Sequence, residues 1–113
     1  MEMTTENMED KIVIKCKGEI EIHAAPDLKD EIKIQVNSGA NMIIIDMNDV
    51  TYIDSSGLGA VVAGRISAIR KNMRLILVHI PAEIIKLMKK MKLYNLFEVY
   101  ENIGDIPKNK LAG

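Results

Sequence analysis

The chain has 113 residues, of which 48 % are apolar and 27 % are charged, a composition that fits one compact domain and excludes global disorder. Fifteen basic against sixteen acidic residues give a formal net charge of −1, which argues against a non-specific nucleic-acid binder. No apolar run approaches the roughly 18 residues of a membrane-spanning helix, and the acidic start MEMTTENMED lacks the apolar segment of a secretory signal. We therefore predict a cytoplasmic protein without membrane insertion.

The spacing of apolar residues predicts alternating strands and helices after a polar start. Residues 1–10 are predicted as a mobile lead-in, with a weak edge strand at Met3–Glu6 as the alternative. The elements that follow are a strand at Lys11–Gly18 that continues weakly through Glu19–Ile22, a helix from Pro26 to Ser38-Gly39, a buried strand at Met42–Ile45, an extended piece at Thr51–Ile53, a helix after Asp54, a strand at Arg74–Ile80, a helix opened by Pro81 and a last strand at Leu96–Tyr100. Residues 101–113 are predicted as a short helix or a tail.

This order of elements predicts a single α/β domain over residues 11–100. Strands joined by crossover helices run parallel, with right-handed connections. The early strand has no crossover helix before it, so it is expected to run antiparallel. The predicted fold is a small mixed sheet, with parallel later strands, flanked by helices.

The chain contains few side chains suited to metal or redox chemistry. Cys16 is its one cysteine, which excludes an internal disulfide, and its alternation with Ile12 and Ile14 predicts a small buried side chain on a strand. His23 and His79 lie far apart in the sequence and have no neighbouring cysteine. The spacing therefore predicts no metal site.

The helix after Asp54 is predicted to have two distinct faces. One face is apolar and is expected to enter the core; it carries Leu58, Val61, Val62, Ile66 and Ile69. The other side has little side-chain bulk and carries Ala60, Gly64 and Ser67. We expect a partner to close over this small-residue side.

The stretch Asp54-Ser55-Ser56-Gly57-Leu58-Gly59 carries the strongest functional signal. It joins a strand to a helix, where free N–H groups gather, and Asp54 or Ser55 is suited to cap the helix. Glycine costs about 1 kcal/mol relative to alanine inside a helix. Gly57 and Gly59 therefore indicate that another element, a ligand or a partner approaches the backbone closely.

We considered three functions for a serine in this position. A phosphate-binding loop would need GxxxxGK[ST] or GxGxxG, and neither is present. A serine nucleophile would need a base, and His79 ends a strand that could neighbour the loop, but the glycine two residues before the serine is missing. The third is an exposed serine that is itself phosphorylated, which adds a charge of about −1.5 to −2 beside Asp54.

Four segments together resemble the anti-sigma factor antagonists, the stand-alone STAS-domain family of bacterial sporulation and general-stress switches. The resemblance extends from about Lys11 to Tyr100, and the DSSGLG hexapeptide is its most specific part. The segments are Gly18-Glu19-Ile20-Glu21, Asp54-Ser55-Ser56-Gly57-Leu58-Gly59, Pro81-Ala82-Glu83-Ile84 and Leu93-Tyr94-Asn95-Leu96-Phe97.

The resemblance implies a partner-switching protein with no enzymatic activity and no cofactor. In the family, the unphosphorylated antagonist binds an anti-sigma factor that is also a serine kinase, and the sigma factor is released. The kinase phosphorylates the serine that matches Ser55, and a metal-dependent serine phosphatase reverses the modification. The residues expected to contact the partner are Glu21, Asp54, Ser56, Gly57 and Gly59.

The sequence departs from the family pattern at three places. Glu21 stands where aspartate is usual, which bears on partner contacts, whereas Lys71-Asn72 and Lys92 replace usual glycines at helix ends. Two alternatives remain open: a STAS module of a stress-sensing complex or of an anion-transporter regulator, and a small serine hydrolase. The sequence leaves the oligomeric state open.

Overall fold

The computed structural model describes residues 1–107, which form a five-stranded mixed sheet with three α-helices. The strands lie in chain order across the sheet, with β1 antiparallel to β2 and all other neighbours parallel. The strands are β1 (Glu2–Met8), β2 (Lys11–Ile20), β3 (Met42–Ile53), β4 (Arg74–Val78) and β5 (Glu98–Tyr100). The helices are α1 (Ala25–Gln35), α2 (Ser55–Arg70) and α3 (Ala82–Lys90), with short 3₁₀ helices η1 (Tyr94–Leu96) and η2 (Ile103–Asp105). The predicted fold class is confirmed.

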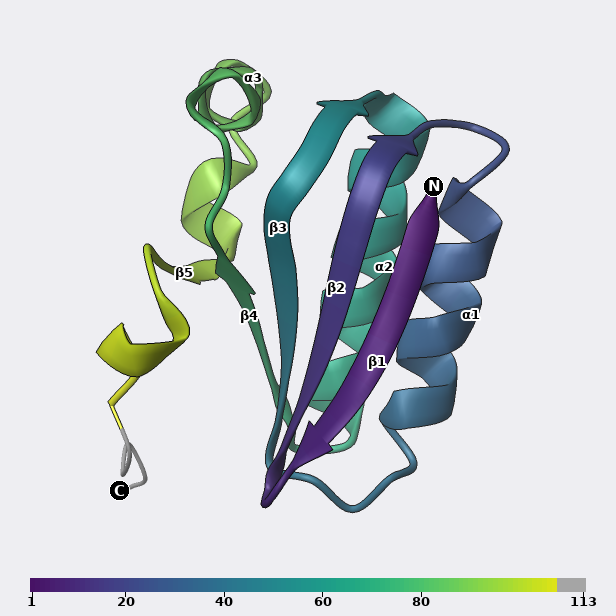
Figure 1. The fold of residues 1–113 in the computed structure, drawn as a ribbon, viewed down its shortest axis with the longest axis vertical. Coiled ribbons are helices and arrows are strands. Elements are labelled where there is room, and N and C mark those ends of the chain that lie inside the picture. The colour runs from purple at the N-terminus through teal and green to yellow at the C-terminus, as the bar shows by residue number, and fades with distance from the viewer. Residues whose placement is uncertain (108–113) are drawn as a thin grey trace.

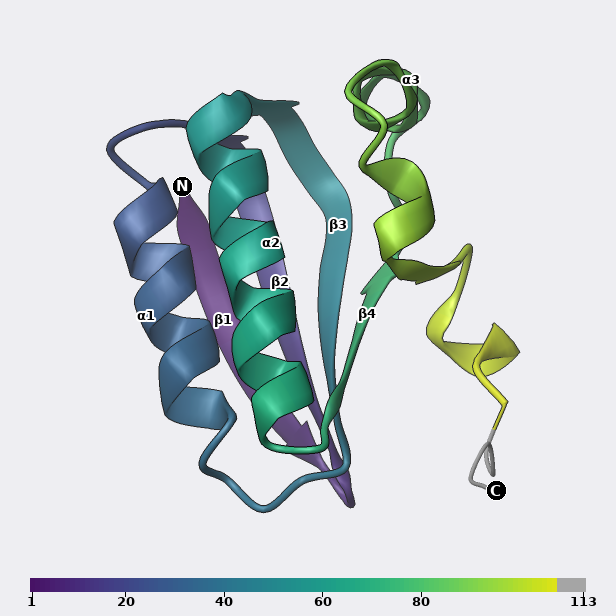
Figure 2. The ribbon, with the colours of Figure 1, turned by 180° about the vertical axis from the view of Figure 1, so that it is seen from behind.

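The helices are distributed unequally around the sheet. Helices α1 and α2 lie side by side on one face (Figure 2), and the main core fills the space beneath them. Helix α3 stands apart from them, on the β4 and β5 side of the sheet (Figure 1). The opposite face carries a smaller group of apolar side chains, here called the open-face cluster: Val13, Met42, Ile44, Ile76 and Val78.

The N-terminal residues differ from the predicted lead-in. Residues 2–8 form a full edge strand, in which Glu2 pairs with Lys17 and Met8 with Lys11. This strand, and not the one at residues 11–20, is the antiparallel member of the sheet. The polar sequence gave little sign of it because an edge strand over exposed positions needs almost no apolar side chains.

Strand β3 joins two segments that the sequence separates. The predicted strand at 42–45 and the extended piece at 51–53 are one twelve-residue strand. Its first half pairs with β4 as far as Asp46, whereas the rest pairs only with β2, with two register shifts on the way. Such irregularities bend a strand. Because only β2 and β3 pair beyond Asp46, they form a two-stranded arm that extends past the end of β4.

The faces of α2 are a correction to the sequence analysis. Gly64 and Ala60 are buried, and a Cβ added at Gly64 would lie 2.6 Å from Cδ1 of Ile32 in α1. In contrast, Ile66 and Ile69 are 47 % and 52 % exposed. The small side chains therefore serve the close approach of α1 to α2, and two of the predicted core residues face solvent.

Several helix and strand ends are set by left-handed backbone conformations. Asn72 and Lys92 have φ values of 58° and 59°, at the ends of α2 and α3. Both ends carry the hydrogen bonds of a Schellman motif, for example Leu93 N–H to the Met88 carbonyl at 2.8 Å. Strand β4 stops at Val78 rather than at residue 80 because His79 has a φ of 55°.

The last segments are shorter than predicted. Strand β5 begins at Glu98, since residues 94–96 form η1, and η2 is the short helix within the predicted C-terminal region. The prediction for residues 108–113 lies outside the described part of the chain.

Candidate functional site

The extended arm of β2 and β3 brings the predicted site residues to one end of the sheet, at the start of α2. The Asp54 N–H donates to the Ile20 carbonyl at 3.3 Å, which ties the turn to the end of β2. Asp54 has an extended backbone, and its Oδ1 accepts the Gly57 N–H at 2.9 Å. Asp54 is therefore the N-cap of α2, as the sequence suggested for Asp54 or Ser55.

Ser55 is the first residue of α2, and its side chain is exposed. Ser56 is half-buried and lines a shallow groove of about 480 Å³ between the starts of α1 and α2. Ala25, Pro26, Lys29 and Gly59 are also part of this groove, together with Ile22, which is 62 % exposed. Of the two serines, only Ser55 is exposed.

The two glycines of the motif have opposite surroundings. A Cβ added at Gly57 would lie 2.2 Å from the Ile20 carbonyl oxygen and 2.6 Å from Cγ1 of Ile53. A Cβ added at Gly59 would meet no atom within 4 Å, and Gly59 is exposed. Gly57 thus has a packing role that explains it without a partner, whereas Gly59 has no packing reason to be glycine.

Glu21 lies beside this site but is engaged in its own loop. Its carboxylate accepts the N–H groups of His23 at 3.2 Å and Ala24 at 3.0 Å. The Glu21 carbonyl accepts the N–H groups of Ala24 and Ala25 as well. The side chain therefore shapes the entry into α1, next to the residue that anchors Asp54.

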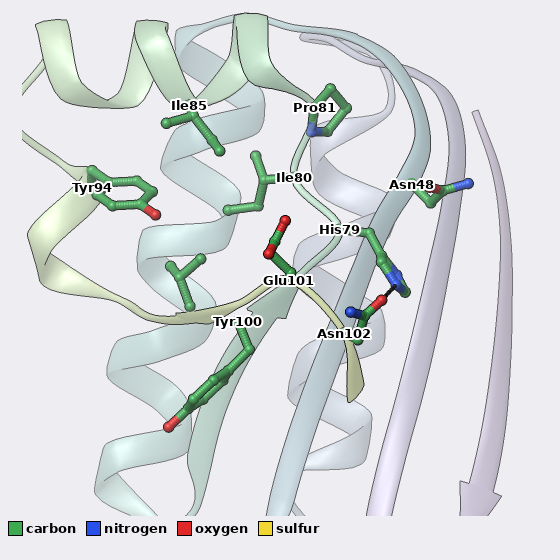
Figure 3. A pocket seen from close by; sticks show the side chains of 10 residues that line it. Asn48, His79, Ile80, Pro81, Ile85, Tyr94, Tyr100, Glu101 and Asn102 are labelled. Atoms are coloured by element: carbon green, nitrogen blue, oxygen red, sulfur yellow. Dashed lines mark hydrogen bonds between the residues drawn. The ribbon is translucent and has the colours of Figure 1, made fainter. Parts of the chain in front are cut away.

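A second polar site, which the sequence analysis did not identify, lies where β3 and β4 separate. His79 Nδ1 lies 3.0 Å from Oδ1 of Asp46, and its Nε2 lies 3.0 Å from Oδ1 of Asn102 (Figure 3). Hydrogen bonding to Asp46 and then to Asn102 raises the pKa of His79 above its ordinary value of 6.5, while partial burial and the charge of Lys15 act in the opposite direction. A pocket of about 470 Å³ opens beside His79, between Pro81, Ile85, Tyr94 and Asn102.

The structure does not bring Ser55 and His79 together. Asp46 is paired with Val78, and Ile53 lies seven residues further along β3, a distance on the order of 20 Å at about 3.3 Å per residue. The imidazole is also already bonded at both nitrogens. A serine nucleophile activated by this histidine therefore has no support in the geometry.

Cys16 lies in the core, as predicted, with 2 % of its surface exposed. Burial first, and the charge of Asp46 second, raise the pKa of its thiol from 9.0 to about 11. Within residues 1–107 no cluster of three metal-ligating side chains occurs, and no helix is long and apolar enough to cross a membrane.

The family model of the STAS domain matches residues 2–106 of this chain. An anti-sigma-B factor antagonist of Listeria monocytogenes is 30 % identical over 101 residues, which cover 88 % of each chain. The chain therefore belongs to the STAS domain family and, within it, groups with the anti-sigma factor antagonists, as the sequence resemblance predicted.

Solved structures share the fold at lower identity. A protein described as a putative anti-sigma factor antagonist from Thermotoga maritima superposes with a TM-score of 0.83 at 22 % identity, over 91 % of this chain and 89 % of that one. The Bacillus cell fate determinant SpoIIAA in its phosphorylated form gives a TM-score of 0.70 at 20 % identity, over 89 % and 93 % of the two chains. These likenesses establish the architecture.

The positions of Asp46 and His79 in the sequence could have indicated the second site. Asp46 directly follows the apolar run at 42–45 and His79 directly follows the apolar run at 75–78, and these two runs pair in parallel, so the two polar residues lie at matching ends of neighbouring runs. Asn102 carried no such signal, because it comes from the irregular segment after β5.

Proposed function

We propose that this protein is an anti-sigma factor antagonist whose unphosphorylated form binds an anti-sigma factor with serine kinase activity and thereby releases a sigma factor. Phosphorylation of Ser55 blocks this binding, and a metal-dependent serine phosphatase restores it. The proposal places the cycle in the cytoplasm. The name of the Listeria relative supports an anti-sigma factor as the partner, and the phosphorylated form of SpoIIAA supports the modification.

The observation that carries the proposal is the exposed serine with a bare helix surface beside it. Ser55 is presented at the start of α2, and Gly59, one turn further on, leaves open space where a side chain would otherwise stand. A partner backbone can therefore approach α2 closely at this point. Ser56 and the exposed Ile22 extend the same surface toward α1.

The proposed switch acts through charge at the surface rather than through unfolding. A phosphate on Ser55 lies near the partial positive charge of the α2 N-terminus, so the folded domain tolerates it. At a closed interface the same group is a bulky anion beside Asp54 that loses its water. Like-charge contacts and unpaired buried anions cost several kcal/mol in binding.

The first experiment tests which residue the kinase phosphorylates. Incubation with the anti-sigma factor kinase captured from the native cell and ATP is expected to add one phosphate, at Ser55. Peptide mass spectrometry distinguishes this from phosphorylation of Ser56, whose half-buried side chain faces the groove. A phosphate found on Ser56, or on Thr4 or Thr5, would contradict the assignment.

The binding step is tested with charge and bulk at separate positions. Ser55→Asp and Gly59→Leu are each expected to lower affinity for that anti-sigma factor at least about tenfold, or 1.4 kcal/mol, in titration calorimetry. Ser38→Asp is the control, because Ser38 is exposed just beyond the opposite end of α1. Wild-type affinity in both site variants would place the interface elsewhere, while equal losses in the control would indicate a general charge effect.

A further inference from the structure

The side chain of His79 links three parts of the chain that are distant in sequence. His79 follows β4 with its backbone in the left-handed region, at φ 55°. From there its ring reaches Asp46 at the middle of β3 through Nδ1 and Asn102 in the segment after β5 through Nε2. Figure 3 shows the ring and the Asn102 amide directed at one another beside the pocket.

The hydrogen bonds around the ring determine which atoms must carry protons. The Asn102 Nδ2 donates to Oδ2 of Asp105 at 3.3 Å, which turns Oδ1 of the amide toward His79. Rotating the amide would bring its oxygen against the Asp105 carboxylate. Both ring nitrogens of His79 therefore face an acceptor, the Asp46 carboxylate on one side and the Asn102 carbonyl on the other.

Only the doubly protonated imidazolium can donate to both acceptors at once. A neutral ring that keeps the bond to Asp46 must place the lone pair of Nε2 against the oxygen of Asn102. The contact with Asn102 then changes from attraction to repulsion. Loss of one proton thus weakens the link between β4 and the segment after β5.

We propose that Asp46, His79 and Asn102 form a proton-controlled clasp, which holds residues 102–106 against the sheet when His79 is protonated and loosens them when it is neutral. These residues, here called the C-terminal segment, include η2 and its capping box of Asn102 and Asp105. Ile103 and Ile106 of the segment pack on the open-face cluster. Loosening the clasp therefore uncovers apolar surface on that face and widens the pocket beside His79.

Other groups near His79 act on the clasp in known directions. Lys15 of β2 opposes protonation, whereas the charge of Asp46 favours it. Asp49 lines the hollow on one side of the ring, and Glu101 lines the pocket on the other side, together with Tyr94 and Tyr100. The hydrogen bond to Asp46 has the largest effect and the charge of Lys15 the smallest, so the surroundings as a whole favour the closed, protonated form.

The direction of the pH dependence follows from linkage. The pKa of His79 in the folded protein lies above the ordinary 6.5, so the contribution of the clasp is complete below about pH 6.5. It is lost as the pH rises through the folded-state pKa. The clasp is therefore closed in acid and loosens toward the alkaline side.

A second tie keeps β5 in place during this change. Arg74 of β4 is paired with Glu98 of β5, and the Tyr100 hydroxyl also donates to Glu98 at 2.9 Å. The hydrogen bond to Glu98 raises the pKa of Arg74 above its ordinary value, and burial and then the hydrogen bond to Glu98 raise the pKa of Tyr100, so neither group changes its charge in the range in which histidine titrates. Only the C-terminal segment is expected to move, while the strand before it stays in the sheet.

The experiment is a titration of the full chain by ¹H–¹⁵N NMR between pH 5.5 and 9. The amides of Asn102, Ile103 and Ile106 are expected to shift with the same midpoint as the His79 ring, and above it the exchange protection of the Ile106 amide falls about tenfold. In His79→Gln the shift is expected to vanish, because glutamine does not titrate. His23→Gln, which removes the other histidine, should leave it unchanged.

Asn102→Ala makes the test independent of how well His79→Gln folds. Removing this acceptor is expected to lower the midpoint of His79 and to abolish the coupled shift of Ile106. The proposal is overturned if the C-terminal segment ignores pH while His79 titrates, if the shift persists in His79→Gln, or if the His79 midpoint is the same in Asn102→Ala.

Discussion

Replacing the glycines of α2 with alanine tests which of them are required for packing and which leave free space at the surface. At Gly59 an added methyl group meets nothing within 4 Å, so the change acts only through the backbone. Alanine is about 1 kcal/mol more favourable than glycine in a helix, and part of the gain comes from a less flexible unfolded chain. Gly59→Ala is therefore expected to raise the free energy of unfolding by about 1 kcal/mol.

The same substitution at Gly57 is expected to have the opposite sign. The new methyl group would stand 2.2 Å from the Ile20 carbonyl oxygen, which belongs to the backbone and cannot rotate away. Helix α2 would have to move off the end of β2, and the hydrogen bond from Gly57 to Asp54 would be strained with it. Overpacking costs about 1–3 kcal/mol, and a backbone obstacle places Gly57→Ala at or above the upper limit.

Gly64 provides the intermediate case. Its methyl group would lie 2.6 Å from Cδ1 and 3.1 Å from Cγ2 of Ile32, and these side-chain atoms can shift more easily than a backbone atom. Gly64→Ala is expected to lose about 1–2 kcal/mol, reduced by the gain in helix propensity.

Urea denaturation followed by circular dichroism at 222 nm measures all three variants, with the slope of the transition as a check on two-state unfolding. The expected order of stability is Gly59→Ala, wild type, Gly64→Ala and Gly57→Ala. If Gly57→Ala were as stable as wild type, Gly57 would not be required for packing against β2. If Gly59→Ala were less stable than wild type, the space beside Gly59 would not be free.

Three further outcomes are expected from the structure. Leu58→Ala should lower stability by about 2–5 kcal/mol, measured by the same denaturation, because Leu58 is 1 % exposed and the change leaves a cavity. Lys92→Gly should raise the thermal midpoint, through a gain of about 1 kcal/mol in stability, since Lys92 has a φ of 59°. Lys89→Gly, in the last turn of α3, should lower the midpoint. Cys16, with a thiol pKa of about 11, should react with a thiol reagent at pH 8 about 100-fold more slowly in the native protein than in guanidinium chloride; equal rates would contradict its burial.

The parts of the fold that sequence could predict are those with a strong apolar period. The alternation around Ile12 and Ile14 and the four-residue spacing of Leu28 and Ile32 each predicted an element that the structure contains. The hexapeptide from residue 54 predicts the start of α2 because an aspartate after a strand is suited to accept the free N–H groups of a following helix.

The remainder depends on contacts that periodicity does not encode. In α2 the apolar spacing correctly predicts that Leu58 and Val61 are buried, but it also places Ile66 in the core. Glycine and alanine carry little hydrophobic signal, so the burial of Ala60 and Gly64 could not be predicted. The link between His79 and Asp46 joins residues 33 apart in sequence, and its geometry depends on the left-handed backbone at His79. A left-handed backbone at a histidine between β-branched residues cannot be predicted from the sequence.

The arm formed by β2 and β3 beyond β4 keeps the turn that carries Ser55 away from the His79 site, which lies where the arm begins. The turn that carries Ser55 is anchored to β2 through Ile20 and has no strand of the β4 and β5 side beside it. A charge added at the tip therefore has few rigid neighbours through which to strain the rest of the sheet. We therefore expect the proposed phosphorylation of Ser55 and the proposed protonation change at His79 to affect the domain independently of one another.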